Sequence, residues 1–171
     1  YQEAITYCKR GIKIFPSSAN TYYHMANSLI KLNLKQEAIE NYYKTIFYNQ
    51  THFFAYHSLG NIFLINGEIN KAIHNYTKAI EFKPDFAEAH NSLGNALTQI
   101  GKSEEAASSY TKALKLKTDY KEARDNLINF LTFYTPKTQK LNTNIVASQL
   151  LQSIKFNSYP GKKISDNDVA T

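Results

Sequence analysis

The sequence predicts an all-α fold, a solenoid of stacked antiparallel helix pairs, on three observations. The stretch 53–86 recurs directly afterwards as 87–120, with the same residue types at matching places. Within each copy, apolar residues follow the spacing i, i+3, i+7, which places them on one face of a helix. Glycine then marks the turn between the two helices of a copy. A fixed period of this length is typical of repeat architectures, in which neighbouring units bury each other's apolar faces. The matching pairs are Leu59/Leu93, Gly60/Gly94, Asn61/Asn95, Ala72/Ala106, Tyr76/Tyr110 and Ala79/Ala113.

The chain begins inside a repeat. Residues 1–18 align with the second half of the unit, because Cys8 and Pro16 fall where later copies carry tyrosine and proline. We therefore predict a single helix whose partner is missing, and expect its apolar face, with Ile5 and Ile12, to be exposed. The sequence looks like a piece of a longer protein. Cys8 occupies a core place, so we expect it to be an inert packing residue.

Three full repeats follow this half repeat. The first helix of each carries an apolar stripe, and the second helix carries alanines and an aromatic residue at matching places. The three repeats are predicted over residues 19–52, 53–86 and 87–120. The three stripes are Tyr22, Met25 and Leu29; Tyr56, Leu59 and Phe63; and His90, Leu93 and Leu97.

Four glycines indicate how each helix pair packs and turns. Gly60 and Gly94 lie inside the first helix, where glycine costs about 1 kcal/mol relative to alanine. We expect that the paired helix crosses at this place and leaves no room for a side chain. Gly67 and Gly101 are expected to take the left-handed conformation that ends a helix.

After the third repeat the pattern continues only through a first helix, predicted over 121–135. The array therefore spans 1–136. Residues 137–171 are rich in Lys, Asn, Ser and Thr and contain one amphipathic helix, predicted at about 143–156. Two interpretations stay open for this segment: a helix that caps the last repeat, or a linker into a further domain.

Charge and composition exclude several classes of protein. The net charge is +6, but residues 19–134 carry twelve basic and eleven acidic residues, so the array itself is close to neutral. A column of basic residues recurs at one repeat position, and a solvated outer face explains it better than a nucleic-acid track. No apolar run is long enough to span a membrane. The single cysteine suits a reducing compartment, so we expect a cytoplasmic protein. The column is Arg10, Lys44, Lys78 and Lys112.

The repeats resemble those of the tetratricopeptide repeat family. The second repeat matches the family pattern at all eight spaced places, and the other repeats depart at Met25, Thr45, Gln50, His90 and Thr118. The resemblance covers about residues 2–134. It implies a right-handed superhelix whose first helices line a concave face, where the family binds peptides and proteins and has no catalytic residues. The eight matching residues are Tyr56, Leu59, Gly60, Phe63, Ala72, Tyr76, Ala79 and Pro84.

If the first helices line this groove, one of its columns consists of asparagine alone. Asn27, Asn61, Asn95 and Asn129 recur once per repeat at the same place and would form a ladder along the groove. An amide offers donors and an acceptor, so it can hold the backbone of an extended peptide without reading its side chains. A similar ladder occurs in the superhelical repeats of O-linked N-acetylglucosamine transferases. The alternative is that these asparagines only bond to neighbouring backbone or to an adjacent repeat.

Other groove residues flank this column and change in character along it, from aromatic and weakly basic to polar and acidic. The family members that grip chaperone C-termini carry Lys or Arg at groove places where this chain has Tyr, His, Ser and Asn, so we exclude that binding mode. His24 and His57 could approach each other, but two histidines without a third ligand do not make a metal site. The predicted flanking residues are Tyr23, His24, Lys31, Phe54, His57, Ser58, Asn91 and Ser92.

The sequence therefore predicts a non-catalytic scaffold that binds a protein or peptide segment. It contains no phosphate loop, HExxH, CxxC or nucleophile motif, and we expect no cofactor, metal, nucleic acid or membrane. An alternative is that the repeats are a substrate-recruiting or oligomerising arm of a larger enzyme, such as a glycosyltransferase or oxygenase. Self-association through the terminal helices or the tail is a third possibility.

Overall fold

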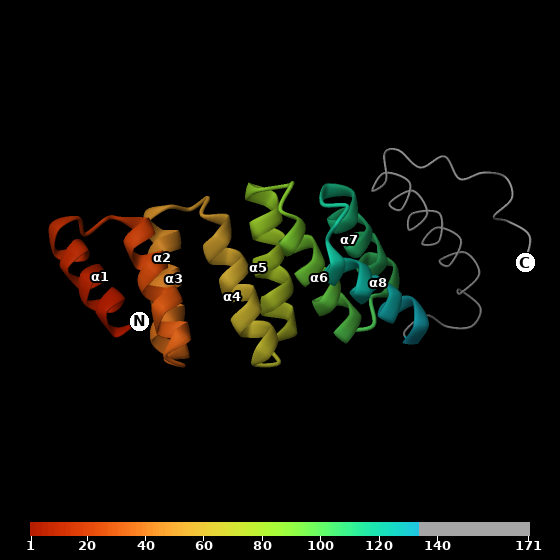
Figure 1. The fold of residues 1–171 in the computed structure, drawn as a ribbon, viewed down its shortest axis with the longest axis horizontal. Coiled ribbons are helices and arrows are strands. Elements are labelled where there is room, and N and C mark those ends of the chain that lie inside the picture. Colours follow the sequence, from red (N-terminus) through yellow and green to blue (C-terminus); the bar gives the residue numbers. More distant parts are fainter. Residues whose placement is uncertain (134–171) are drawn as a thin grey trace, which may run out of the picture.

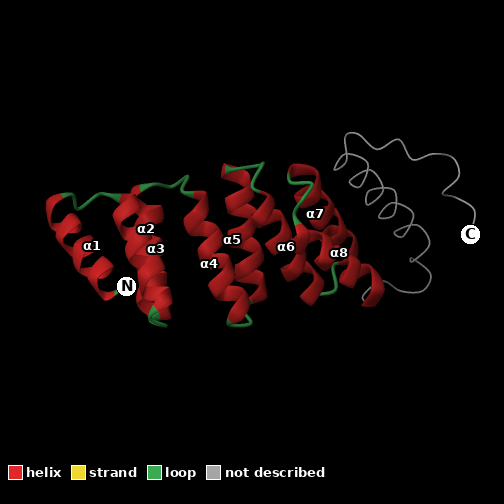
Figure 2. Cartoon of the chain, viewed as in Figure 1, coloured by secondary structure: helices red, strands yellow, loops and turns green. Residues whose placement is uncertain are grey.

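A computed structural model describes residues 1–133, which form eight helices and no strand (Figures 1 and 2). The helices follow one another along a row, and each is antiparallel to the next (Figure 1). The predicted all-α solenoid is confirmed, whereas the predicted helix at 143–156 lies outside the described residues. The helices are α1 (Gln2–Ile14), α2 (Ala19–Lys31), α3 (Lys35–Tyr48), α4 (Phe53–Ile65), α5 (Ile69–Phe82), α6 (Ala87–Gln99), α7 (Ser103–Leu116) and α8 (Lys121–Phe133).

The most extensive contacts are those within the pairs α2/α3, α4/α5 and α6/α7. Each pair is joined by a turn with one residue in the left-handed region. Gly67 (φ 78°) and Gly101 (φ 72°) take this conformation as predicted, and Asn33 (φ 61°) takes it in the first repeat. The backbone N–H after each of these residues donates to a carbonyl of the preceding helix, as in Glu68 N–H to Phe63 O at 2.8 Å. The same closure therefore ends the first helix of every repeat.

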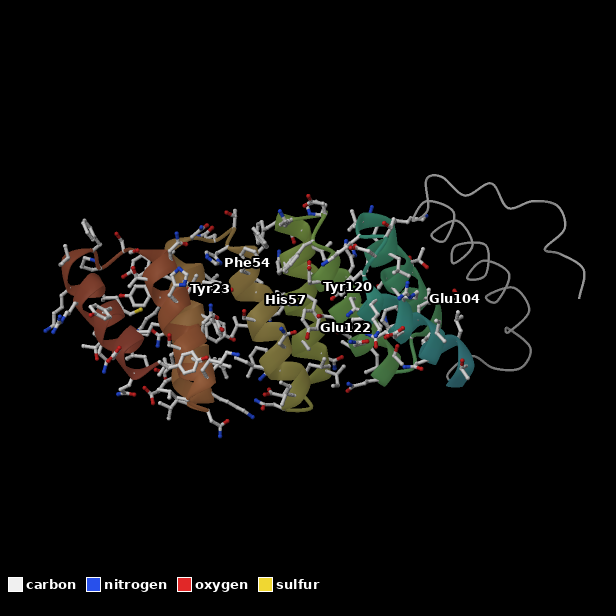
Figure 3. All side chains as sticks on the ribbon, in the orientation of Figure 1. Tyr23, Phe54, His57, Glu104, Tyr120 and Glu122 are labelled. Atoms are coloured by element: carbon white, nitrogen blue, oxygen red, sulfur yellow. The ribbon has the colours of Figure 1, made fainter. Side chains whose placement is uncertain are left out.

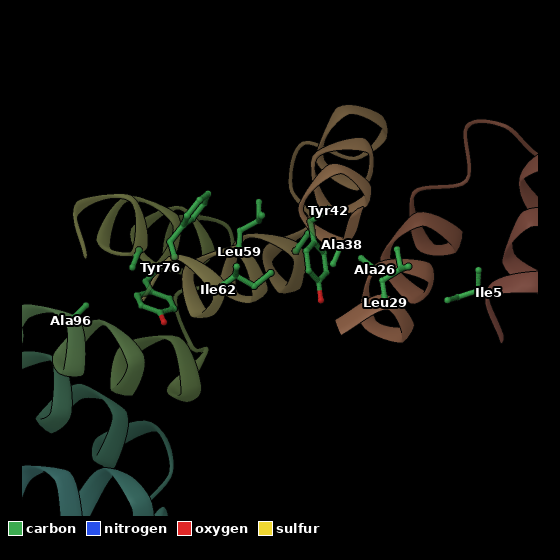
Figure 4. Packing of buried hydrophobic residues seen from close by; sticks show 12 residues of the cluster. Ile5, Ala26, Leu29, Ala38, Tyr42, Leu59, Ile62, Tyr76 and Ala96 are labelled. Atoms are coloured by element: carbon green, nitrogen blue, oxygen red, sulfur yellow. The ribbon is translucent and has the colours of Figure 1, made fainter. Parts of the chain in front are cut away.

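The buried residues form a strip along the row rather than a ball. Figure 4 shows this strip passing from Ile5 on α1 through Leu29, Tyr42 and Tyr76 to Ala96 on α6. A strip of this kind is the expected core of stacked repeats, because each unit buries its apolar face against its neighbours.

The prediction that Ile5 is exposed is wrong. Ile5 is only 4% exposed because α1 packs against α2, as each second helix packs against the next repeat. Ile12 is half-buried. The large apolar side chains left exposed on this helix are instead Tyr7 and Ile14.

The glycines inside the first helices have the packing reason that the sequence suggested. A Cβ atom on Gly60 would lie 2.5 Å from Cε1 of Tyr76, and one on Gly94 would lie 2.6 Å from Cε1 of Tyr110. The missing side chain therefore makes room for the aromatic ring of the paired helix, which lies directly against the glycine backbone.

Candidate peptide-binding groove

The asparagine column lies on the first helices of the repeats, α2, α4, α6 and α8. We call this surface the asparagine face and define it by Asn27, Asn61, Asn95 and Asn129. Asn27, Asn61 and Asn95 are half-buried, and Asn129 is exposed. Figure 3 shows further polar and aromatic side chains along the same row of helices; those labelled include Tyr23, Phe54, His57, Tyr120 and Glu122.

Three of these asparagines accept a hydrogen bond from a tyrosine of the paired helix. The distance from the hydroxyl to Oδ1 is 2.6 Å for Tyr42 and Asn27, and 2.8 Å for both Tyr76 and Asn61 and Tyr110 and Asn95. The bond joins side chains of one repeat, so neither neighbouring backbone nor an adjacent repeat is the partner. Burial raises the pKa of Tyr42 to about 12 and also raises that of Tyr76, so both hydroxyls keep their protons at neutral pH.

The tyrosine bond determines how each amide is oriented. Because Oδ1 faces the hydroxyl, the Nδ2 group with its two N–H donors points elsewhere. Within residues 1–133, no hydrogen bond uses Nδ2 of Asn27, Asn61 or Asn95. The amides of Asn27, Asn61 and Asn95 therefore have their donors available, whereas their Oδ1 atoms are already hydrogen-bonded. The sequence contained a signal for this pairing, since the same spacing separates asparagine and tyrosine in each of the three repeats.

Two pockets lie between consecutive asparagines. The first, of about 420 Å³, lies between the first and second repeats and includes Asn27, Asn61, Tyr42 and Ser58. The second, of about 360 Å³, lies between the third repeat and α8. It is lined by Leu64, Asn95, Thr98, Gln99, Tyr110, Asn126, Asn129 and Phe130.

Aromatic rings form a cluster along the N-terminal ends of the first helices. The ring of Tyr23 lies 4.7 Å from that of His52, and the ring of Phe54, which is 44% exposed, lies 5.4 Å from that of Phe86. His57 joins the same cluster, with its ring 5.0 Å from that of Phe86. His52 and Phe86 were not predicted as site residues, because they precede the helices and belong to no repeated groove position.

His57 does not pair with His24. Its Nε2 is hydrogen-bonded to Oγ of Ser92 at 3.1 Å, which links α4 to α6, while His24 packs against Tyr23. Burial lowers the pKa of His57 to about 4, and the nearby Glu88 only partly offsets this. In the described part of the chain, no three His, Cys, Asp or Glu residues are grouped as metal ligands would be.

Acidic pH should destabilise the protein through its partly buried histidines, above all His57. The pKa of His57 is about 4 in the folded state and 6.5 in an unperturbed chain, so between these values only the unfolded state binds the proton. The contribution of His57 to the free energy of unfolding is therefore complete above about pH 6.5 and is lost as the pH falls towards 4. Burial lowers the pKa of His52 and of His90 as well, which acts in the same direction.

We expect the free energy of unfolding to be about 1–2 kcal/mol lower at pH 5 than at pH 7, as measured by urea unfolding at both pH values. The His57→Gln variant is the control, because it removes the main titrating group. An equally steep loss in that variant would contradict the role of His57.

Asn91 was predicted as a peptide-binding residue, and the structure gives it a different role. Its side chain is 1% exposed, and both polar atoms have partners on α8 or just before it. Nδ2 donates to Oε1 of Glu122 at 3.2 Å and to the hydroxyl of Tyr120 at 3.5 Å, while Oδ1 accepts from Asn126 at 3.0 Å. A buried, fully bonded amide cannot reach a ligand, so Asn91 holds α8 against α6.

Comparison with known proteins agrees with this architecture. A profile described as TPR repeat matches residues 60–101, and two described as tetratricopeptide repeat match residues 19–46 and 87–120. The chain belongs to the tetratricopeptide repeat family. Repeats of this family mediate protein–protein interactions and are typically non-catalytic. The resemblance to the repeats of O-linked N-acetylglucosamine transferases stays a prediction.

Solved structures share the fold of this tetratricopeptide repeat array. The crystal structure of MamA is 22% identical, with a TM-score of 0.73, over 91% of this chain and 90% of the other. The Arabidopsis OM64 TPR domain is 21% identical, with a TM-score of 0.64, over 67% of this chain and 95% of the other. At these identities the likeness concerns the fold alone. The comparison with curated proteins gives no match. No helix within residues 1–133 has the length and apolar character needed to cross a membrane.

Proposed function

We propose that this tetratricopeptide repeat array is a protein-interaction scaffold that binds an extended peptide segment across the asparagine face. The observation that carries the proposal is the orientation of Asn27, Asn61 and Asn95, whose Oδ1 atoms are occupied by tyrosine hydroxyls. The amide N–H groups left over are suited to the carbonyl oxygens of a peptide backbone, which recur along an extended chain and do not depend on its sequence.

Side chains of the bound segment would meet two further features of the same face. The aromatic cluster offers the exposed ring of Phe54 beside Tyr23 and His24, and aromatic side chains often dominate binding energy at interfaces. The two pockets offer space for two side chains of the bound segment that lie far apart along it. The other prediction from the sequence, a recruiting arm of a larger enzyme, would use the same surface and stays a prediction.

Alanine is not the best replacement for testing the asparagines. Removing Asn61 would leave the hydroxyl of Tyr76, a residue that is 0% exposed, without its acceptor, at a cost of about 1–3 kcal/mol. Aspartate is better suited, because its carboxylate still accepts from the tyrosine while the N–H donors that have no partner are replaced by an acceptor.

The combined change Asn61→Asp and Asn95→Asp should weaken peptide binding at least about tenfold, because two hydrogen bonds are lost and carboxylates then face peptide carbonyls. The ligand is a peptide enriched by the wild-type protein from a displayed random library, and its affinity is measured by titration calorimetry. Asn49→Asp with Asn70→Asp, at two exposed asparagines of a turn and of α5, adds the same charge away from the asparagine face. Equal affinity of the wild type and a folded Asn61/Asn95 variant would refute the proposal.

A further inference from the structure

The first of the two pockets carries two lysines. Lys31 ends α2 and Lys35 begins α3, and both line the pocket of about 420 Å³. No acidic residue lines it. The rest of the lining combines apolar and hydrogen-bonding groups: Ile30, Ile62 and Ile65, and Asn27, Tyr42, Ser58 and Asn61.

Neither lysine has an acidic partner in the part of the chain that the structure describes. Within residues 1–133, no carboxylate lies within 4.0 Å of Lys31 or Lys35. Five other lysines of these residues do have an acidic partner, whereas Lys112 and Lys115, among others, have none. The distinguishing feature of Lys31 and Lys35 is that both line one pocket. Two like charges at one pocket disfavour each other, and an anion between them relieves that repulsion. Among residues 1–133, the lysines that form ion pairs are Lys71, Lys78, Lys83, Lys102 and Lys117.

The second pocket is lined by asparagines at the same repeat positions but by no lysine or arginine. Asn95 and Asn129 stand there at the repeat positions of Asn27 and Asn61, and no basic residue lines it. Two repeats after the first pocket, Gln99 occupies the place of Lys31 and Ser103 that of Lys35. The array therefore has two equivalent pockets between repeats, of which only the N-terminal one is cationic.

We infer that the first pocket receives the carboxylate of a Glu or Asp side chain in the bound segment; this rests on the proposed function. The lysine ammonium groups supply the opposite charge. Nδ2 of Asn27 and of Asn61 each has two N–H donors, so one can serve the carboxylate while the other serves the peptide backbone. The isoleucines contact the aliphatic stem that precedes the carboxylate. The acidic side chain would thus set the direction and register of a segment whose backbone is otherwise read without sequence preference.

A displayed library of random peptides of about twelve residues, which span about 40 Å when extended, tests this inference. The C-terminus of each peptide is fused to the display protein, so that only side chains bring a carboxylate. The wild type should enrich peptides with an acidic residue at one preferred position. The Lys31→Gln and Lys35→Ser variant, which copies the second pocket, should lose that preference. Adding Gln99→Lys and Ser103→Lys to this variant should move the acidic residue towards the other end of the peptide.

A double-mutant cycle measures the contact directly. The selected peptide should bind the Lys31/Lys35 variant about tenfold more weakly, and its Glu→Gln form should bind wild type and variant almost equally. The affinity for the wild type should also fall with added salt, whereas that for the variant should fall less. Lys112→Gln with Lys115→Gln, two exposed lysines of α7, removes the same charge elsewhere and should leave binding unchanged.

The outcomes separate the two proposals. Enrichment of peptides without an acidic preference, or an acidic preference that survives the Lys31/Lys35 changes, overturns the pocket assignment and leaves peptide binding standing. Absence of any enrichment by the folded wild type overturns the proposed function and the pocket assignment together.

Discussion

Replacing Gly60 by alanine is expected to destabilise the protein by about 2 kcal/mol. The new Cβ would lie 2.5 Å from Cε1 and 2.6 Å from Cδ1 of Tyr76, a ring that is 0% exposed and whose hydroxyl is bonded to Asn61. The ring cannot move away without breaking that bond or displacing its buried neighbours. Alanine gains about 1 kcal/mol in helix propensity, so the overpacking must cost about 3 kcal/mol for this net result.

The control for this prediction is the same substitution at Gly11 in α1. A Cβ there would lie 3.4 Å from Cγ2 of Thr21, which is ordinary contact, so propensity should dominate and Gly11→Ala should be neutral or slightly stabilising. Both variants are compared with the wild type by urea unfolding. A Gly60→Ala protein as stable as the Gly11→Ala protein would show that the helix pair adjusts without cost.

Replacing Asn91 by alanine should cost about 3 kcal/mol and loosen α8 selectively. The change removes a side chain that is 1% exposed, together with its hydrogen bonds to Tyr120, Glu122 and Asn126. In a repeat array each unit contacts only its neighbours, so the loss should appear first in the last helix. Hydrogen exchange should speed up in α8 while the amides of α4 and α5 keep their protection.

Asn129→Ala is the matched control, because Asn129 lies on α8 itself, is exposed and has a side chain that makes no hydrogen bond within residues 1–133. Its removal should change stability by less than about 0.5 kcal/mol. If the Asn91 and Asn129 variants lose the same amount of stability, the bonds of Asn91 do not hold α8 in place.

The fold could be predicted almost completely from periodic positions, because each position of the repeat has one local task and most copies carry a residue type suited to it. Gly67 and Gly101 illustrate this: the turn needs a left-handed residue, and φ values of 78° and 72° are found there. Ile5 illustrates where the prediction fails. Because the first helix paired with α1 is missing, the apolar face of α1 was expected to be exposed. A second helix also packs against the following repeat, however, and the contact of α1 with α2 buries Ile5.

The site was predicted less well, because its properties depend on partners from other helices. The column of Asn27, Asn61 and Asn95 was visible as a spacing, yet its tyrosine partners were interpreted only as core residues. Lys35 was missed as a pocket residue, since it belongs to a second helix and reaches the asparagine face only where two repeats meet.

Spacing along the chain was enough to specify the helix pairs, their period, their turns and the column of asparagines, because all of these are local properties. Contacts between helices were needed to learn which atoms of those asparagines are available and which polar residue is buried. Tyr76 donates to Oδ1 of Asn61, whose Nδ2 donors have no partner within residues 1–133. Both polar atoms of Asn91, in contrast, are hydrogen-bonded to α8 and the residue before it. A hydrogen-bond partner is determined by distance in space, so two asparagines at different positions of the repeat have different uses.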